Sequence, residues 1–231
     1  MRKNQFIPAI LAASTAAMLL AACAMPGGGG GSGAMSFFIS STGSGKGADL
    51  GGLAGADALC QRLAGGAGAS GKTWRAYLST PPTLPAGTAP AVAAIHARDR
   101  IGNGPWYNAK GQLIASDVAQ LHANNSLNKT TALDERGNPV KGRGDTPNEH
   151  DILTGSRADG TAFAPQTDTT CGAWTKSGAD GSAVVGHHDL NGPTSDTWSK
   201  SWNFSHQSAG CSQEALVRTG GSGRLYCFAA N

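Results

Sequence analysis

Two neighbouring stretches decide the fold: Gly55-Ala56-Asp57-Ala58-Leu59-Cys60 and Thr73-Trp74-Arg75-Ala76-Tyr77-Leu78-Ser79. Apolar residues recur at helical spacing from Leu53 through the first stretch to Leu63, which predicts a helix that ends by Gly65-Gly66. In the second stretch, tryptophan, alanine and leucine alternate with arginine and tyrosine, which predicts a half-buried strand. The helix would carry Cys60 inward to meet the last strand of the domain.

The chain after this pair alternates between loops and short elements. Pro81-Pro82 ends the strand, and the residues from Ser116 to Leu121 predict a short second helix with Ser116 as its cap. The stretch from Asn124 to Gly144 is polar and irregular. The residues from Leu225 to Phe228 predict the closing strand, which would bring Cys227 into the core.

The composition indicates a loop-rich domain. Glycine contributes 34 of the 231 residues without a repeating period, and aromatic residues make up only 6%. Such a chain does not favour long helices, which excludes coiled coils, helical repeats and collagen. Lysine and arginine exceed the acids by 18 − 15 = 3 and form no basic block, which argues against a dedicated nucleic-acid binder.

Residues 1–22 are typical of an export signal, because Arg2 and Lys3 precede a short apolar stretch. The stretch ends in Leu20-Ala21-Ala22-Cys23, which resembles the bacterial lipobox. In lipoproteins of that kind the signal is cleaved before the cysteine and the cysteine is acylated. The alternative is an ordinary signal peptide, cleaved at an Ala-x-Ala-like site.

Cleavage before Cys23 would leave a lipidated cysteine and a glycine-rich tether over residues 23–36, followed by a folded domain over residues 37–231. Two or more acyl chains hold a protein stably at a membrane. The expected location is therefore the bacterial cell envelope, with the membrane as a partner. Ala24 follows the cysteine, which in the enteric lipoproteins that this start resembles implies sorting to the outer membrane.

Four cysteines remain, at positions 60, 171, 211 and 227. An even number of cysteines in an exported chain predicts disulfides, since export leads to an oxidising compartment. Four cysteines allow three pairings, and spacing alone leaves all three open. A zinc site is the rival interpretation, but no two of these cysteines have the spacing of a metal knuckle.

The order of several motifs resembles endostatin and bacterial endostatin-like lipoproteins. The motifs are the two opening stretches, Ile152-Leu153-Thr154-Gly155-Ser156, Asp159-Gly160, Thr170-Cys171-Gly172-Ala173-Trp174, Gly210-Cys211 and Leu225-Tyr226-Cys227-Phe228. The resemblance runs from about Phe37 to the C-terminus. It implies an α+β, C-type-lectin-like fold that is loop-rich, with two helices packed on antiparallel sheets. It also implies two nested disulfides, Cys60–Cys227 and Cys171–Cys211.

Calcium-dependent C-type lectins carry two sugar-site signatures that have partial counterparts here. Pro147-Asn148-Glu149 precedes Cys171, and Trp202-Asn203 precedes Cys211, so Asn148, Glu149, Trp202 and Asn203 are the candidate ligand-binding residues. Thr146 and Phe204 stand where the signatures have acids. Calcium needs carboxylate charge among six to eight oxygen ligands. We therefore expect no cofactor, with calcium as the alternative.

The densest group of titratable residues is Gly186-His187-His188-Asp189, with His206 beyond it. Histidine and aspartate are good ligands for zinc or copper, so His187, His188, Asp189 and His206 are candidate metal ligands. Adjacent side chains in a strand point to opposite faces, however, so both histidines would not reach one ion. The alternative is one buried, hydrogen-bonded histidine and one exposed histidine.

These observations favour a binding protein over an enzyme. We expect a lectin-like or adhesin-like domain that recognises a glycan, a glycosaminoglycan or a protein through loops at 124–154 and 179–208, with no nucleic acid as partner. One alternative is an envelope polysaccharide hydrolase that uses His150 and Asp151 beside Glu149, but we interpret those residues as a solvated loop. Another is a structural envelope protein without a soluble ligand.

Arg143-Gly144-Asp145 matches an adhesion tripeptide, and we interpret it as a polar turn.

Overall fold

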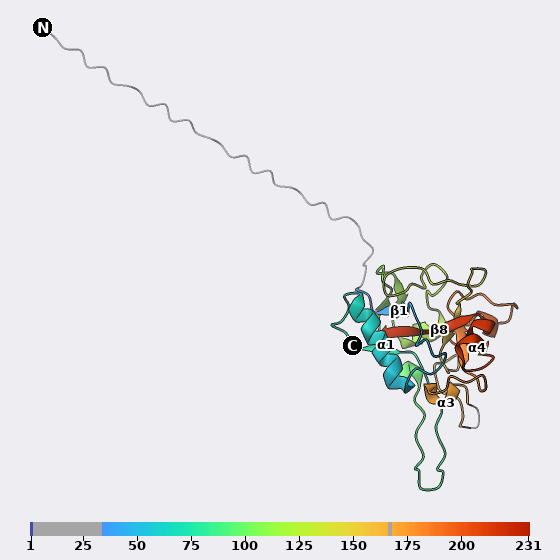
Figure 1. Cartoon of the computed structure of the whole chain (residues 1–231). Coiled ribbons are helices and arrows are strands. Elements are labelled where there is room, and N and C mark those ends of the chain that lie inside the picture. The colour runs from blue at the N-terminus through green and yellow to red at the C-terminus, as the bar shows by residue number, and fades with distance from the viewer. Residues whose placement is uncertain (2–33, 166–167) are drawn as a thin grey trace. The chain divides into compact units, whose positions relative to one another are not determined.

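The computed structural model describes Met1, residues 34–165 and residues 168–231. Residues 2–22 of the predicted signal and the lipidation site Cys23 lie outside the described residues. The domain forms one compact α+β unit that continues to the C-terminus (Figure 1). Among the described residues, no helix has the length and apolar character needed to cross a membrane.

The helices and strands are short and separated by long loops. In chain order they are β1 (Phe37–Ile39), α1 (Gly52–Gly66), β2 (Trp74–Ala76), β3 (Trp106–Tyr107), β4 (Leu113–Ala115), α2 (Val118–Ala123), β5 (Asp151–Leu153), α3 (Cys171–Trp174), β6 (Val184–His187), β7 (His206–Gln207), α4 (Gln213–Thr219) and β8 (Gly221–Ala229). Single 3-10 turns lie at Ala97–Asp99 and Trp198–Lys200.

The main sheet is built around β8, which is its longest strand (Figure 1). The strand order is β1-β8-β5-β6-β7, and β2 also pairs with β8. A separate hairpin joins β3 to β4. The expectation of antiparallel sheets is correct for every pair but one, because β5 runs parallel to β8. Long connections separate these two strands, and such connections are what a parallel pair requires.

The side chains of β8 alternate between two hydrophobic cores, because successive side chains of a strand point to opposite faces. Leu225 and Cys227 face a core that α1 covers, together with α3 and α4. Tyr226 and Phe228 face a second core that contains residues of β3, β4 and α2. The sheet is therefore buried on both faces, and four short α-helices in the described residues cover it rather than the two that the resemblance implied.

The predicted first helix is confirmed as α1. It buries Ala56, Leu59 and Cys60 and ends at Gly66, within the predicted glycine pair. The following strand is shorter than its alternating pattern indicated, because β2 ends at Ala76. Tyr77 is fully buried in the second core, although the alternation placed it on the outer face.

The predicted second helix exists as α2, but its cap is wrong by one residue. The Asp117 carboxylate, not Ser116, accepts the hydrogen bond from the Gln120 backbone N–H, at 2.8 Å. That hydrogen bond holds the pKa of Asp117 below its ordinary value. Ser116 instead donates to the same carboxylate, at 2.7 Å.

Both nested disulfides are present. Cys60 joins α1 to β8 through Cys227, and Cys171 of α3 joins Cys211 in the loop before α4. The four cysteines are fully buried in the core beneath α1. This pairing excludes a zinc site made of these four cysteines, since bridged sulfurs are not thiolate ligands.

Candidate metal centre

The register of the sheet brings acidic and imidazole side chains to one face. Asp151, the first residue of β5, lies directly opposite His187, the last residue of β6. On the other side of β6, His206 of β7 lies opposite Val185, two residues before His187. Since residues two apart in a strand share a face, Asp151, His187 and His206 face the same side. His150 reaches the group from the residue just before β5.

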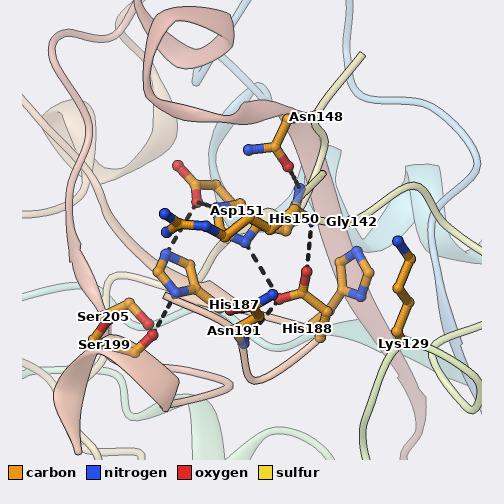
Figure 2. A network of polar contacts seen from close by, with 12 residues as sticks. Lys129, Gly142, Asn148, His150, Asp151, His187, His188, Asn191, Ser199 and Ser205 are labelled. Carbon is orange, nitrogen blue, oxygen red and sulfur yellow. Dashed lines mark hydrogen bonds and ion pairs between the residues drawn. The ribbon is translucent and has the colours of Figure 1, made fainter. Parts of the chain in front are cut away.

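Three imidazole nitrogens surround one carboxylate oxygen. The Nε2 atoms of His150, His187 and His206 lie 3.2, 3.3 and 3.4 Å from Asp151 Oδ1. Figure 2 shows His150, Asp151 and His187 gathered at the centre of the polar network. The rings of His150 and His187 stack with their centroids 4.1 Å apart. The donor atoms of His150, Asp151 and His187 all lie within 4.8 Å of one another.

The outer nitrogen of each ring already has a partner. His187 Nδ1 lies 2.7 Å from the Ser199 carbonyl oxygen, and His206 Nδ1 lies 3.0 Å from that of Gln207. A carbonyl oxygen only accepts, so Nδ1 must carry the proton in both rings. In the neutral imidazole, Nε2 then has a free lone pair, and that lone pair is what binds a metal.

The third ring is held by a carboxylate. His150 Nδ1 lies 3.2 Å from Asp189 Oδ1. A histidine that donates its outer N–H to a carboxylate is a more basic ligand and has a defined orientation. All three rings thus have the outer partner that metal-binding histidines usually have.

The inner atoms lack partners of their own. Within the described part of the chain, Asp151 Oδ1, Asp151 Oδ2 and His187 Nε2 are buried without a hydrogen bond. The exposed fraction is 2% for Asp151 and 1% for His187. A buried carboxylate without a hydrogen-bond donor is costly, and any of these imidazoles that is neutral, with its Nε2 lone pair toward the carboxylate, adds repulsion. A cation among these atoms would remove both penalties.

The electrostatics of the centre favour positive charge. Burial alone would raise the pKa of Asp151, but its contacts with His187 and His206 outweigh burial and hold the pKa below the ordinary value. Burial would lower the pKa of His206, yet the Asp151 carboxylate raises it above the ordinary value. Both shifts follow from the same negative charge held in a buried place.

The distances between the imidazole nitrogens and the Asp151 oxygen are close to those between the ligand atoms of a zinc site. Zinc binds histidine nitrogen and carboxylate oxygen at about 2.0–2.2 Å, so the ligand atoms of a tetrahedral site lie roughly 3.3–3.5 Å apart. The three nitrogen–oxygen distances here are 3.2–3.4 Å. Three imidazoles and one carboxylate also suit zinc better than calcium, which prefers oxygen ligands. His150, Asp151 and His187 therefore form a donor set that suits a zinc-class ion, and His206 contacts the same Asp151 oxygen from the next strand.

The four metal candidates predicted from the sequence fall into different roles. His187 and His206 join the centre, whereas Asp189 supports His150 from outside. His188 turns to the other face, as the alternation of a strand requires, and its Nε2 contacts the Lys141 carbonyl oxygen at 3.1 Å. The expectation of one exposed histidine is wrong, because His187 and His188 are both buried. Burial lowers the pKa of His188.

The interpretation of His150 and Asp151 as part of a solvated loop is also wrong. Their exposed fractions are 4% and 2%, and Asp151 begins a central strand. A usable signal was present in the apolar residues Ile152-Leu153, which mark a buried strand at this point. The pairing of that strand with β6, which brings Asp151 to His187, involves residues far apart in the sequence and has no local signal.

Two of the four candidate ligand-binding residues lie beneath the surface, and the other two immediately precede His150 in the chain. Trp202 and Asn203 are buried, and Asn203 Nδ2 donates to the Tyr77 hydroxyl at 2.9 Å. Glu149 pairs with Arg224 at 2.8 Å, and Asn148 accepts from the His150 backbone N–H at 3.3 Å. The Trp202 ring packs against Tyr77 and Tyr226, so all four side chains have structural partners within the protein.

The tripeptide Arg143-Gly144-Asp145 forms a turn. The Asp145 backbone N–H donates to the Gly142 carbonyl at 3.1 Å, and Gly144 has a positive φ of 90°. The Asp145 carboxylate accepts from the Gly142 N–H and pairs with Lys129, both at 2.8 Å. Its carboxylate is therefore occupied within the loop.

Comparison of the sequence with known proteins does not assign this chain to a family. No protein-family model matches the chain, and no curated protein is similar to it.

Proposed function

We propose that this protein is a lipid-anchored binding domain of the bacterial cell envelope whose binding loops are held together by a zinc-class metal ion. One observation carries the proposal: His150 and Asp151 come from one predicted binding loop, His187 and His206 come from the other, and all three imidazoles contact the same Asp151 oxygen. An ion there would tie residues 124–154 to residues 179–208. The ligand of the loop face would be a glycan, a glycosaminoglycan or an envelope or host protein.

The centre supports a structural rather than a hydrolytic role for the ion. His206 as a fourth protein ligand would complete a tetrahedral site and leave no position for water, whereas catalytic zinc keeps one. His150, Asp151 and His187 are nearly inaccessible, and only the His206 side chain, at 29% exposure, reaches the surface. This arrangement supports a binding protein over the alternative of an envelope hydrolase.

The finer fold proposal is a C-type-lectin-like domain. The nested disulfides support it, together with the long C-terminal strand that pairs with β1 and β2. In that architecture, loops beside a rigid sheet form the binding face. An experimental structure with another strand order would contradict this part of the proposal.

Metal binding is tested on the full exported chain, purified without a polyhistidine tag. We expect one zinc per chain by elemental analysis, and a cobalt-substituted protein with the intense visible bands of four-coordinate cobalt. Asp151→Asn and His206→Gln should each weaken metal affinity at least about 100-fold, because losing a ligand costs more than the roughly 10–100-fold effect of losing a ligand's partner. His206→Gln changes the most accessible member, so it also tests the site if Asp151→Asn fails to fold.

His96→Gln is the matched control, since it removes an imidazole outside the centre whose Nδ1 accepts from the Ala162 N–H. Its metal affinity should equal that of the unchanged chain. Less than one metal per chain in the unchanged protein, or equal affinity in Asp151→Asn and His206→Gln, would overturn the metal centre. A glycan and matrix-protein array with and without EDTA then tests whether loop recognition depends on the ion.

The lipid anchor is tested in growing cells. Metabolic labelling with palmitate should mark the unchanged chain and leave Cys23→Ser unlabelled, because the thiol is the acceptor for the diacylglycerol. Both proteins should be exported at similar levels. Equal labelling of the two chains would refute the anchor without affecting the metal proposal.

A further inference from the structure

We propose that Asp189 couples the metal centre to the loop at residues 141–149, so that binding of the ion fixes the part of the surface that carries Lys141 and Arg143. This inference rests on the proposed function, because it concerns the same centre. It assigns Asp189 a positioning role, with no contact to the ion.

Asp189 connects three segments through one buried carboxylate. Its side chain is 1% exposed. Oδ1 faces His150 Nδ1 at 3.2 Å and accepts from the Asn191 N–H at 3.1 Å. Oδ2 accepts from the Arg143 N–H at 2.7 Å. These bonds hold the pKa of Asp189 well below its ordinary value, although burial would raise it.

The loop is built to approach this carboxylate closely. A Cβ on Gly142 would lie 2.6 Å from Asp189 Oδ2, so a larger residue there would displace this carboxylate. Asp145 closes the turn by accepting from the Gly142 N–H, and Lys129 holds Asp145 from outside. A second contact comes from His188, whose Nε2 meets the Lys141 carbonyl oxygen. The loop thus rests on residues 188–189, immediately after β6.

The coupling follows from the two nitrogens of one imidazole ring. An ion bound at His150 Nε2 takes that lone pair, so Nδ1 must carry the proton and donate it to Asp189. The ring is then held at both ends, and the Asp189 carboxylate is held in the position where it accepts from Arg143. Without the ion, the His150 ring still stacks on His187, but nothing at Nε2 fixes which nitrogen carries the proton, so the hydrogen bond to Asp189 is weaker and the loop loses part of its support. Coupling of this kind is reciprocal, so loosening Asp189 must also weaken metal binding.

The rate of trypsin cleavage measures how well the loop is held in place, because Lys141 and Arg143 are exposed. We expect zinc to slow cleavage after these residues by at least about tenfold in the unchanged chain, within the range of ordinary coupling energies. Cleavage after Lys110, in the exposed turn between β3 and β4, should not change on metal addition. Fragments are identified by mass after reduction, since the disulfides would otherwise hold them together.

Two isosteric variants distinguish the coupling through Asp189 from the stability of the loop itself. Asp189→Asn should weaken cobalt affinity by roughly 10–100-fold and remove the protection of Arg143. Asp145→Asn is the matched control, because it loosens the same turn without touching His150. It should leave cobalt affinity unchanged while raising cleavage with and without the ion.

The outcomes keep this inference separate from the proposed function. If the unchanged chain binds no metal, the proposed function fails first. If it binds metal but Asp189→Asn binds equally well, or cleavage after Arg143 does not respond to zinc, then the coupling is refuted and the metal centre stands. The protection experiment on the unchanged chain needs no variant, so misfolding of Asp189→Asn would not leave the inference untested.

Discussion

A single glycine determines how closely two parts of the centre approach one another. Gly186 lies in β6, just before His187, and a Cβ at this position would lie 1.8 Å from the Trp202 carbonyl oxygen. The backbone at residues 202–203 leads directly to β7 and His206. The absence of a side chain at Gly186 therefore lets the segment that carries His206 pack against the strand that carries His187.

Gly186→Ala should lower the free energy of unfolding by at least about 2 kcal/mol, because the added methyl group meets backbone atoms that have no room to move. Gly66→Ala is the control, since a Cβ at that position in α1 meets nothing within 4 Å. It should leave stability unchanged or raise it by up to about 1 kcal/mol. Urea denaturation of both variants measures the difference, and similar midpoints for the two would show that Gly186 is not constrained.

At the scale of elements, Asp57 attaches α1 to the sheet. Its Oδ1 accepts from the Ala76 N–H of β2 at 2.9 Å, and its carboxylate pairs with Arg100 at 2.7 Å. Both members of the ion pair are nearly buried, with side chains 10% and 12% exposed. Arg75 adds a more exposed contact at 2.7 Å. The opening helix and strand are therefore joined by a polar contact as well as by apolar packing.

Asp57→Ala should destabilise the protein by about 3–5 kcal/mol, since it leaves the Arg100 guanidinium buried without its partner. Lys176→Ala removes a matched ion pair on the surface, where Lys176 is 53% exposed and lies 3.5 Å from Asp168. That change should stay within about 0.5 kcal/mol. Thermal and urea unfolding distinguish the two cases. A loss below about 1 kcal/mol for Asp57→Ala would mean that packing alone holds α1 in place.

At the scale of the whole molecule, the disulfides compensate for a chain with few aromatic residues and many glycines. The bridges span 167 and 40 residues. Loop-closure entropy assigns them about 5 and 4 kcal/mol, and the two values do not add because one loop lies inside the other. The outer bridge joins the first helix to the last strand, so both ends of the domain are fixed to one sheet. The centre at Asp151 lies in the strand next to that last strand.

The sequence by itself determined the features that depend on nearby residues, and its resemblance to a known family supplied two long-range ones. Apolar spacing predicted α1 and its end at Gly66, and the apolar run around Cys227 predicted β8. The motif order, through its resemblance to endostatin, implied both disulfide pairings and an α+β fold. Alternation along a strand correctly indicated that His187 and His188 do not share a site.

Only the tertiary structure decided the features that depend on register between distant strands. The pairing of Asp151 with His187 and of Val185 with His206 joins segments that no local pattern connects, and it turns two residues of an apparent polar loop into the buried centre. It also placed Trp202 and Asn203 in the interior, where sequence signatures indicated a ligand surface. Local propensity acts over a few residues, whereas register is chosen by the packing of whole faces, so α1 and β8 could be predicted from the sequence and the cluster around Asp151 could not.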